Sequence, residues 1–128
     1  MIVGIGVDLL EIDRVRKAYQ KHPKRFLDRC FTEFEQKYCL RKKDPAESLA
    51  GRFCVKEAVI KAFSHGFGGR WKWRDIEVLR EPSGKPVLKL HRRFEELRVE
   101  RGIIRMHVTI AHSKGDAFSQ VILEKDPA

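Results

Sequence analysis

Two acidic residues and one lysine stand where carboxylate and phosphate chemistry could take place. Asp8 follows a short apolar stretch, and Glu57 and Lys61 are four residues apart, so the latter two share one face of any helix. Asp8 could be a metal ligand, the N-cap of a following helix or a solvent-facing end residue. Glu57 and Lys61 could equally be an ordinary surface pair, worth about 0.2 to 0.5 kcal/mol. Spacing alone leaves these alternatives open.

Basic residues accompany this group. Arg52, Lys56 and Lys61 bring several cations near one carboxylate, just before a glycine-rich segment whose backbone N–H groups could approach a phosphate. The run from His112 to Lys114 could hold an anion or form an ordinary polar turn. The glycine-rich segment has neither the spacing of a dinucleotide fingerprint nor the Lys-Ser/Thr ending of a Walker loop, so neither nucleotide-binding fold is predicted.

The composition describes one basic, globular domain. The chain has 128 residues, and its 27 basic and 18 acidic side chains give a formal net charge of +9. We expect a single domain over 1–128, because domains usually run to about 100 to 200 residues. A content of 42% hydrophobic and 35% charged residues excludes a disordered chain and a membrane protein. The charge indicates an anionic partner: nucleic acid, a membrane surface, a phosphorylated small molecule or an acidic protein.

The apolar stretches and the cysteines favour a cytoplasmic location. The longest uncharged apolar stretch, 1–7, is far shorter than a membrane span of about 20 residues, and no basic leader or cleavage site accompanies it. Cys30, Cys39 and Cys54 are odd in number and show no CxxC spacing, so we expect buried thiols rather than a zinc site or disulfides.

Periodicity and turn residues predict an α+β fold in the order β-α-α-α-β-β-α-β-β, with a largely antiparallel sheet packed on a long central helix. The expected strands cover 1–8, 75–79, 87–90, 106–111 and 117–124. The expected helices cover 13–29 with a break at Pro23, 33–40 after a capping box at Thr32, 45–64, and 91–101. The last four strands form two hairpins.

The first strand alternates strictly. Val3, Ile5 and Val7 point to one side, while Gly4, Gly6 and Asp8 point to the other. The strand is therefore expected to have one open face. The glycines leave room beside Asp8 for another backbone or a ligand.

The helix over 45–64 has the strongest signal. Asp44 is a good N-cap, Pro45 suits the first helical position, and Glu47 could reach back to the N–H of the cap. Small residues near Glu57 and Lys61 would let these two side chains face a close neighbour. At 100° per residue the helix has a core stripe of Leu49, Phe53, Ile60 and Phe63 and a neighbouring face of Ala50, Cys54, Glu57 and Lys61.

Taken in order, eight segments resemble the holo-acyl-carrier-protein synthase family over about 125 residues. The segments are GIGVDLLEIDR at 4–14, FTE at 31–33, LAGRF at 49–53, KEA at 56–58, KA at 61–62, DIEV at 75–78, GKP at 84–86 and IAHS at 110–113. The resemblance implies a small, trimeric 4'-phosphopantetheinyl transferase with active sites between subunits. Such an enzyme moves the phosphopantetheine arm of coenzyme A onto a serine of acyl carrier protein in fatty acid biosynthesis and releases adenosine 3',5'-bisphosphate.

The resemblance also implies roles for individual residues. Asp8 and Glu57 would hold Mg²⁺, with Mn²⁺ as a possible substitute, and two carboxylates suffice because Mg²⁺ completes its shell with phosphate and water oxygens. Lys61 would add a second cation, and either Glu57 or a water molecule would take the serine proton. The implied contacts with coenzyme A are Arg52, Lys61, Gly66, Gly84, Lys85, Pro86, His112 and Ser113. The implied contacts with the acidic carrier are Arg14, Arg25, Phe26 and Arg29.

A rival interpretation is a basic nucleic-acid-binding module without catalytic activity. The net charge and the interleaved Trp71 and Trp73 motivate it, because bases can stack on exposed aromatic side chains. Two tryptophans before a strand more commonly pack into the core. Such a module would also have no common reason to carry Asp8, Gly51, Glu57 and His112 in this order.

Overall fold

A computed structural model describes residues 1–64 and 68–127. The strands are β1 (Ile2–Glu11), β2 (Ile76–Arg80), β3 (Pro86–Leu90), β4 (Ile103–Ser113) and β5 (Asp116–Lys125). The helices are α1 (Ile12–Lys21), α2 (Pro23–Cys30), α3 (Glu33–Leu40), α4 (Pro45–Phe63) and α5 (Arg92–Glu100), with a 3-10 turn over Trp73–Asp75. The α+β class and the predicted order are confirmed, and so is the break at Pro23, which divides the first helical stretch into α1 and α2.

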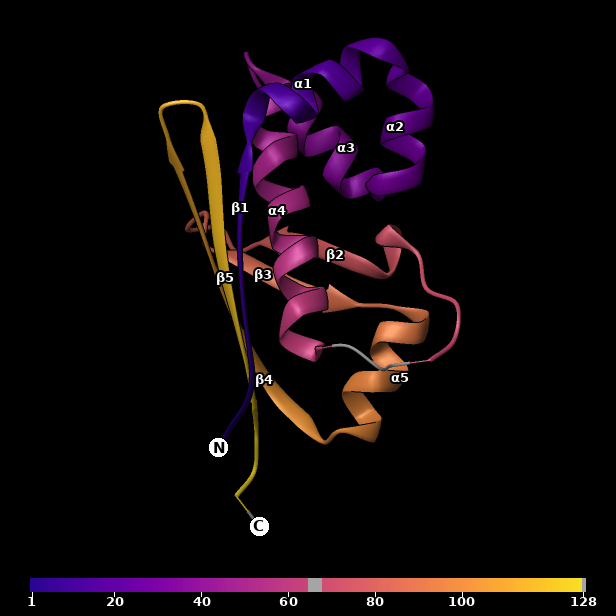
Figure 1. Cartoon of the computed structure of the whole chain (residues 1–128), viewed down its shortest axis with the longest axis vertical. Coiled ribbons are helices and arrows are strands. Elements are labelled where there is room, and N and C mark those ends of the chain that lie inside the picture. The colour runs from indigo at the N-terminus through magenta and orange to yellow at the C-terminus, as the bar shows by residue number, and fades with distance from the viewer. Residues whose placement is uncertain (65–67, 128) are drawn as a thin grey trace.

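The strands form two antiparallel sheets around α4. The larger sheet has the order β1-β5-β4, and β2 pairs with β3 in a separate hairpin. Figure 1 shows α4 in the middle of the molecule, alongside β1, with the other helices on the same side of the larger sheet as α4. The opposite face of that sheet is left uncovered by the helices.

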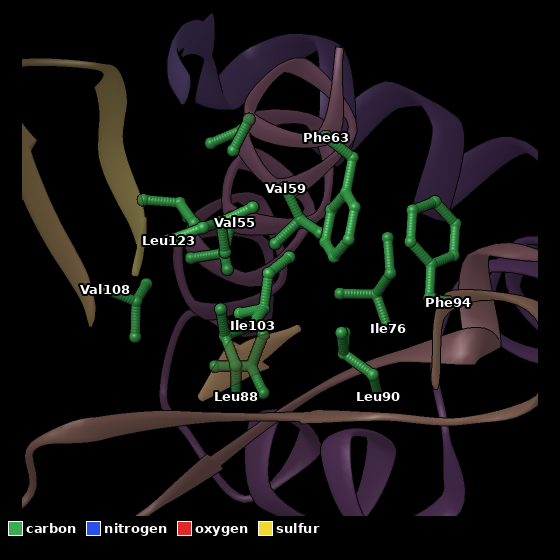
Figure 2. Packing of buried hydrophobic residues seen from close by; sticks show 14 of the residues in the cluster. Val55, Val59, Phe63, Ile76, Leu88, Leu90, Phe94, Ile103, Val108 and Leu123 are labelled. Atoms are coloured by element: carbon green, nitrogen blue, oxygen red, sulfur yellow. The ribbon is translucent and has the colours of Figure 1, made fainter. Parts of the chain in front are cut away.

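Two clusters of buried side chains meet along α4. Its second half packs against both sheets and α5, where the rings of Phe63 and Phe94 meet edge to face at 5.5 Å (Figure 2). Its first half packs against α1, α2 and α3. Because neighbours surround the helix, Val55 and Val59 are as deeply buried as Phe63. The predicted core stripe was therefore incomplete.

The backbone between β1 and α4 is unusually close, and the glycines of β1 allow it. A Cβ atom at Gly6 would overlap the carbonyl oxygen of Ala58, and one at Gly4 would overlap that of Ala62. The room that the sequence predicted beside Asp8 is thus filled by another backbone. This contact fixes the distance between β1 and the catalytic candidates on α4.

One cap was predicted correctly and one was wrong. At α3, Thr32 accepts a hydrogen bond from the N–H of Glu35, whose carboxylate accepts one from the N–H of Thr32 at 2.8 Å. At α4, Asp44 makes no side-chain cap. Its carboxylate instead accepts a hydrogen bond from Arg16 of α1 at 2.7 Å, because a guanidinium outcompetes the backbone N–H as a partner.

The aromatic pair and the cysteines are packed inside. Trp73 lies 4.8 Å from the ring of Phe53, and Trp71 lies 5.7 Å from that of Phe94. The packing interpretation is confirmed, with both tryptophans partly buried against the two core clusters. All three cysteines are free and buried. Within the described ranges, no helix has the length and apolar character needed for a membrane span.

Candidate active site

The Asp8 side chain lies between β1 and α4. It points toward α4, its carboxylate is 8% exposed, and its Oδ1 accepts a hydrogen bond from the Lys61 ammonium at 2.7 Å. Asp8 lies well inside β1, and Glu11 rather than Asp8 occupies the N-cap position of α1. The cap and end-residue alternatives are therefore wrong for Asp8.

Glu57 lies one helical turn before Lys61 and joins the same cluster. Burial raises the pKa of its carboxyl, and the negative charge of Asp8 raises it further, while Lys61 and Arg14 act in the opposite direction. The raised pKa means that burial and the neighbouring Asp8 together disfavour the ionised form of Glu57. The surface-pair alternative is wrong, because Lys61 donates to Asp8 and Glu57 is partly buried.

The chemistry of this donor set fits a hard divalent cation. Asp8 and Glu57 supply carboxylate oxygens, the ligands that Mg²⁺ uses alongside phosphate and water oxygens. Cys54 lies behind Asp8, where its thiol donates to the Asp8 carbonyl oxygen at 3.2 Å. Burial raises the pKa of that thiol to about 11, so it stays protonated and is not a metal ligand. In residues 1–64 and 68–127, no three His, Cys, Asp or Glu side chains form a metal-binding group.

A cavity of about 430 Å³ opens beside the two carboxylates. Arg14 and Phe26, both predicted to contact the carrier protein, line it together with Asp8 and Glu57. Phe26 is half-buried and its ring meets that of Phe31 at 5.5 Å. The structure therefore brings two of the predicted carrier contacts to the edge of the predicted metal site.

The other two predicted carrier contacts lie farther along α2. Arg25 and Arg29 are exposed, and neither lines the carboxylate cavity. Two nearby cations are neutralised internally: Arg16 pairs with Asp13 and Asp44, and Lys24 pairs with Asp28 at 2.9 Å.

A second cavity, of about 440 Å³, contains the other predicted phosphate contacts. Arg52 and His112 line it, and the Nε2 of His112 lies 3.2 Å from the carbonyl oxygen of Glu47. A Cβ at Gly51 would lie 3.0 Å from the His112 ring, so the glycine makes room for the imidazole. The buried Nε of Arg52 has no hydrogen-bond partner among the described residues.

The remaining predicted contacts with coenzyme A are placed less centrally. Gly84, Lys85 and Pro86 form the end of the β2–β3 turn, where Gly84 has a φ of 93° and its N–H donates to Glu81 at 2.8 Å. Ser113 is exposed at the end of β4 and lines neither cavity. Gly66 lies outside the described residues.

Sequence reasoning missed several residues of the second cavity. Its lining also includes Tyr38, Lys42, Lys43 and Ser48. Helical spacing gave no signal for Tyr38 and Lys42, because Lys42 lies beyond the end of α3 at Leu40. The two cavities share no lining residue. One chain thus presents a carboxylate cavity and, separately, a cationic cavity.

Comparison with known proteins identifies the family. A model of the 4'-phosphopantetheinyl transferase superfamily matches residues 4–114. A holo-[acyl-carrier-protein] synthase from Natranaerobius thermophilus is 41% identical over 126 residues, covering 98% of this chain and 100% of the relative. One from Alkaliphilus metalliredigens is 43% identical over 122 residues, covering 95% and 98%.

Solved structures agree with the sequence matches. The crystal structure of the synthase from Neisseria meningitidis has a TM-score of 0.88 at 29% identity, covering 98% of this chain and 100% of its own. The Bacillus anthracis synthase, solved in complex with CoA (3',5'-ADP), has a TM-score of 0.79 at 38% identity, covering 98% and 99%. The chain therefore belongs to the 4'-phosphopantetheinyl transferase superfamily and, within it, to the holo-[acyl-carrier-protein] synthases.

Proposed function

We propose that this protein transfers the 4'-phosphopantetheine arm of coenzyme A to a serine of apo-acyl carrier protein. The products are holo-acyl carrier protein for fatty acid biosynthesis and adenosine 3',5'-bisphosphate. The observation that carries the proposal is the meeting of Asp8, Glu57 and Lys61 beside one cavity. The cytoplasmic location expected from the sequence stays a prediction.

Asp8 and Glu57 are the proposed ligands of Mg²⁺, with Mn²⁺ as a substitute. The bound metal would supply positive charge that polarises the attacked phosphorus and stabilises the leaving phosphate. The raised pKa of Glu57 supports this assignment, because a bound cation would stabilise the ionised form that burial and Asp8 disfavour.

The side chains of the protein supply the remaining charge and the proton acceptor. The Lys61 side chain is 53% exposed while its ammonium donates to Asp8, so it can contact a phosphate oxygen without leaving the cluster. Glu57, whose pKa is raised, accepts the serine proton directly or through a water molecule. Either path keeps the proton at the edge of the cavity that Arg14 and Phe26 line.

The cationic cavity is the proposed site for the nucleotide end of coenzyme A. Arg52 and His112 would contact a phosphate, with Ser113 beside them, while the turn with Gly84, Lys85 and Pro86 would lie along the adenosine. The glycine at position 66 would allow the backbone to approach the coenzyme. The unpartnered Nε of Arg52 supports this assignment, because a buried donor without a partner is costly until a ligand satisfies it.

The carrier protein is proposed to dock over α1 and α2. Among residues 1–64 and 68–127, Arg14, Arg25 and Arg29 form no ion pair, unlike Arg16 and Lys24. Their charge is therefore free to meet an acidic partner. Phe26 lies between them and would provide the apolar anchor.

A homotrimer is proposed because the larger sheet has an exposed apolar face. Leu9, Phe118 and Ala111 form one cross-strand row on it, and Ile5 pairs with Ile122 in another. An open apolar patch of this kind usually marks an interface. In a ring of three copies, the carboxylate cavity of one chain would face the cationic cavity of its neighbour.

Mixing two inactive variants tests the shared site. Co-expressed Glu57→Gln and Arg52→Ala chains, purified through a separate tag on each so that every trimer contains both, should regain about a third of wild-type activity, because one of the three sites in each mixed ring combines two intact halves. Sedimentation should give three chains per particle. Absence of any regained activity in mixed particles would contradict sharing between subunits.

The transfer itself is tested by weighing the carrier. Incubation of the protein with apo-carrier, coenzyme A and Mg²⁺ should add one phosphopantetheine mass. Asp8→Asn and Glu57→Gln should lose at least about a thousandfold in rate with the fold kept, whereas Glu81→Gln, in an exposed turn, should keep most of the activity. No mass gain with any of several carriers would refute the proposed reaction.

A further inference from the structure

Three cations surround one aromatic ring at the cationic cavity. The Tyr38 ring centroid lies 4.5 Å from Lys42 Nζ, 4.3 Å from the Arg52 guanidinium carbon and 4.9 Å from that of Arg80. Tyr38 comes from α3, Arg52 from α4 and Arg80 from the end of β2. Three separate parts of the fold thus bring like charges to one ring, whose electron-rich face attracts cations.

The charges also act on the phenol of this ring. Burial by itself would raise the pKa of the Tyr38 phenol, but a hydrogen bond with Lys42 lowers it. The charges of Arg52 and Arg80 lower it further, so the pKa lies below its ordinary value. Tyr38 therefore experiences a strongly positive local field.

Within residues 1–64 and 68–127, Lys42, Arg52 and Arg80 form no ion pair. The cavity lining contains two carboxylates, of which Asp44 is already paired with Arg16 at 2.7 Å. Glu47 is left against Lys42, Lys43 and Arg52. A group of like charges that is uncompensated in this way favours a multiply charged anion, and a guanidinium matches the oxygens of a phosphate.

The location of the ring indicates which phosphate is bound. Coenzyme A carries a pyrophosphate, for which the carboxylate cavity with Lys61 is the proposed site, and a separate 3'-phosphate on its ribose. A Cβ at Gly84 would lie 3.6 Å from Arg80 Nη2, so Arg80 connects the proposed adenosine turn to the Tyr38 ring. Because the pyrophosphate is assigned to the carboxylate cavity, the phosphate left for the cationic cavity is the 3'-phosphate.

We infer that Tyr38 is a positioning residue that holds Arg52, Arg80 and Lys42 in place for the 3'-phosphate and so makes the enzyme select coenzyme A over 3'-dephospho-coenzyme A. The inference rests on the proposed function, because it requires the nucleotide to occupy the cationic cavity. Tyr38 acts through the cations and has no catalytic role. Its effect should appear in binding and leave turnover at saturation nearly unchanged.

The test compares two substrates across matched variants. Tyr38→Leu removes the ring, and Tyr38→Phe keeps it without the hydroxyl. Tyr38→Leu should raise KM for coenzyme A about tenfold, with less than about a twofold change in kcat or in KM for 3'-dephospho-coenzyme A. Tyr38→Phe should restore most of the preference. Arg80→Met removes one cation and leaves the ring. It should raise KM about threefold for coenzyme A and leave KM for 3'-dephospho-coenzyme A unchanged.

Direct binding provides a readout that needs neither metal nor carrier. Calorimetry should show about tenfold weaker binding of adenosine 3',5'-bisphosphate to Tyr38→Leu, and unchanged binding of adenosine 5'-monophosphate. If Arg52→Ala abolishes the preference for the 3'-phosphate while Tyr38→Leu and Arg80→Met keep it, the inference is wrong and the proposed site stands. If neither the wild type nor Arg52→Ala discriminates the two nucleotides, the proposed nucleotide site itself is wrong, and the inference falls with it.

Discussion

The ammonium of Lys61 lies 2.7 Å from Oδ1 of Asp8, although the two residues are 53 positions apart in the chain. Lys61 is thus a partner of the proposed metal ligand before any metal or substrate arrives. An ammonium and a divalent cation compete for the same carboxylate charge. The same lysine can therefore weaken metal binding and still assist catalysis.

Replacing Lys61 with methionine should separate these two effects. Without the competing ammonium, Mn²⁺ binding in the absence of nucleotide should tighten about three- to tenfold. Turnover should fall at least about a hundredfold, because a positive charge near the transferred phosphate is lost. Calorimetric titration with Mn²⁺ and the carrier mass assay provide the two measurements.

A matched control is available on α2. Lys24 forms a similar pair with Asp28 at 2.9 Å, away from the cavity, so Lys24→Met should change neither quantity. Lys61→Arg keeps the charge and should keep the weaker metal binding. If Lys61→Met binds Mn²⁺ no more tightly than the wild type, the competition between ammonium and metal is refuted.

The raised pKa of Glu57 makes the metal-free protein sensitive to pH. Above the ordinary value of 4.5 and up to the raised value, the folded state holds more protons than the unfolded state. The contribution of Glu57 to the free energy of unfolding therefore falls as the pH rises through this window. Glu57→Gln should be more stable than the wild type at pH 8 in EDTA, with the difference reduced at pH 4.

Urea unfolding at pH 4, 6 and 8 measures this difference. Glu81→Gln is the control, because Glu81 is exposed in the β2–β3 turn and should give no stabilisation that depends on pH. Adding Mg²⁺ should stabilise the wild type more than Glu57→Gln. If Glu57→Gln is less stable than the wild type at pH 8, burial and the charge of Asp8 do not make the ionised form of Glu57 unfavourable.

Sequence reasoning succeeded where the deciding contacts are local. The Thr32–Glu35 capping box spans three positions, and the break at Pro23 follows from one missing N–H. The alternation around Asp8 also predicted which side of β1 has room for a second backbone. Each of these features depends on residues within one turn or a few strand positions.

Sequence reasoning failed where distant residues decide. The Asp44 carboxylate accepts a hydrogen bond from Arg16, which lies 28 positions earlier in the chain. The favourable N-cap residue at the start of α4 therefore forms no side-chain cap. The Tyr38 ring receives Arg52 and Arg80 from other elements. The sequence around Tyr38 gives no sign of these two ring contacts, because they arise only when α3 packs against α4 and β2.

A buried ion pair next to Glu57 in the chain predicts a large loss of stability. Lys56 is fully buried, and its ammonium donates to Glu35 Oε1 at 2.8 Å and to the Ile76 carbonyl oxygen at 2.6 Å. Burial lowers the pKa of Lys56 despite the nearby carboxylate. Lys56→Met would leave Glu35 as an uncompensated buried charge, so the free energy of unfolding should fall by about 3 to 5 kcal/mol.

The double variant makes this prediction specific. Adding Glu35→Gln to Lys56→Met removes the unpaired buried carboxylate. The double variant should therefore recover about 1 to 2 kcal/mol of the lost free energy of unfolding. Lys37→Met, at an exposed position of α3, should change stability by less than about 0.5 kcal/mol. Urea titrations of the four proteins suffice. A single variant that loses under about 1 kcal/mol would contradict the cost assigned to the unpaired carboxylate.

The contact between β1 and α4 predicts that Gly6 tolerates no side chain. A Cβ there would overlap the carbonyl oxygen of Ala58 and lie 2.7 Å from the backbone N of Ala62. Because the obstacles are backbone atoms, β1 must move away from α4, and Asp8 moves with it. Gly6→Ala should therefore lose about 3 kcal/mol of stability and most of its activity.

A second substitution distinguishes backbone contact from simple crowding. Adding Ala58→Gly should not rescue Gly6→Ala, because it removes a methyl group and leaves the carbonyl oxygen in place. Gly68→Ala is the control, since no atom lies within 4 Å of a Cβ at that position, and it should be nearly neutral. Thermal melts and Mn²⁺ titrations measure stability and the metal site separately. Rescue by Ala58→Gly would mean that side-chain packing, rather than the close approach of two backbones, sets the distance from Asp8 to Glu57 and Lys61.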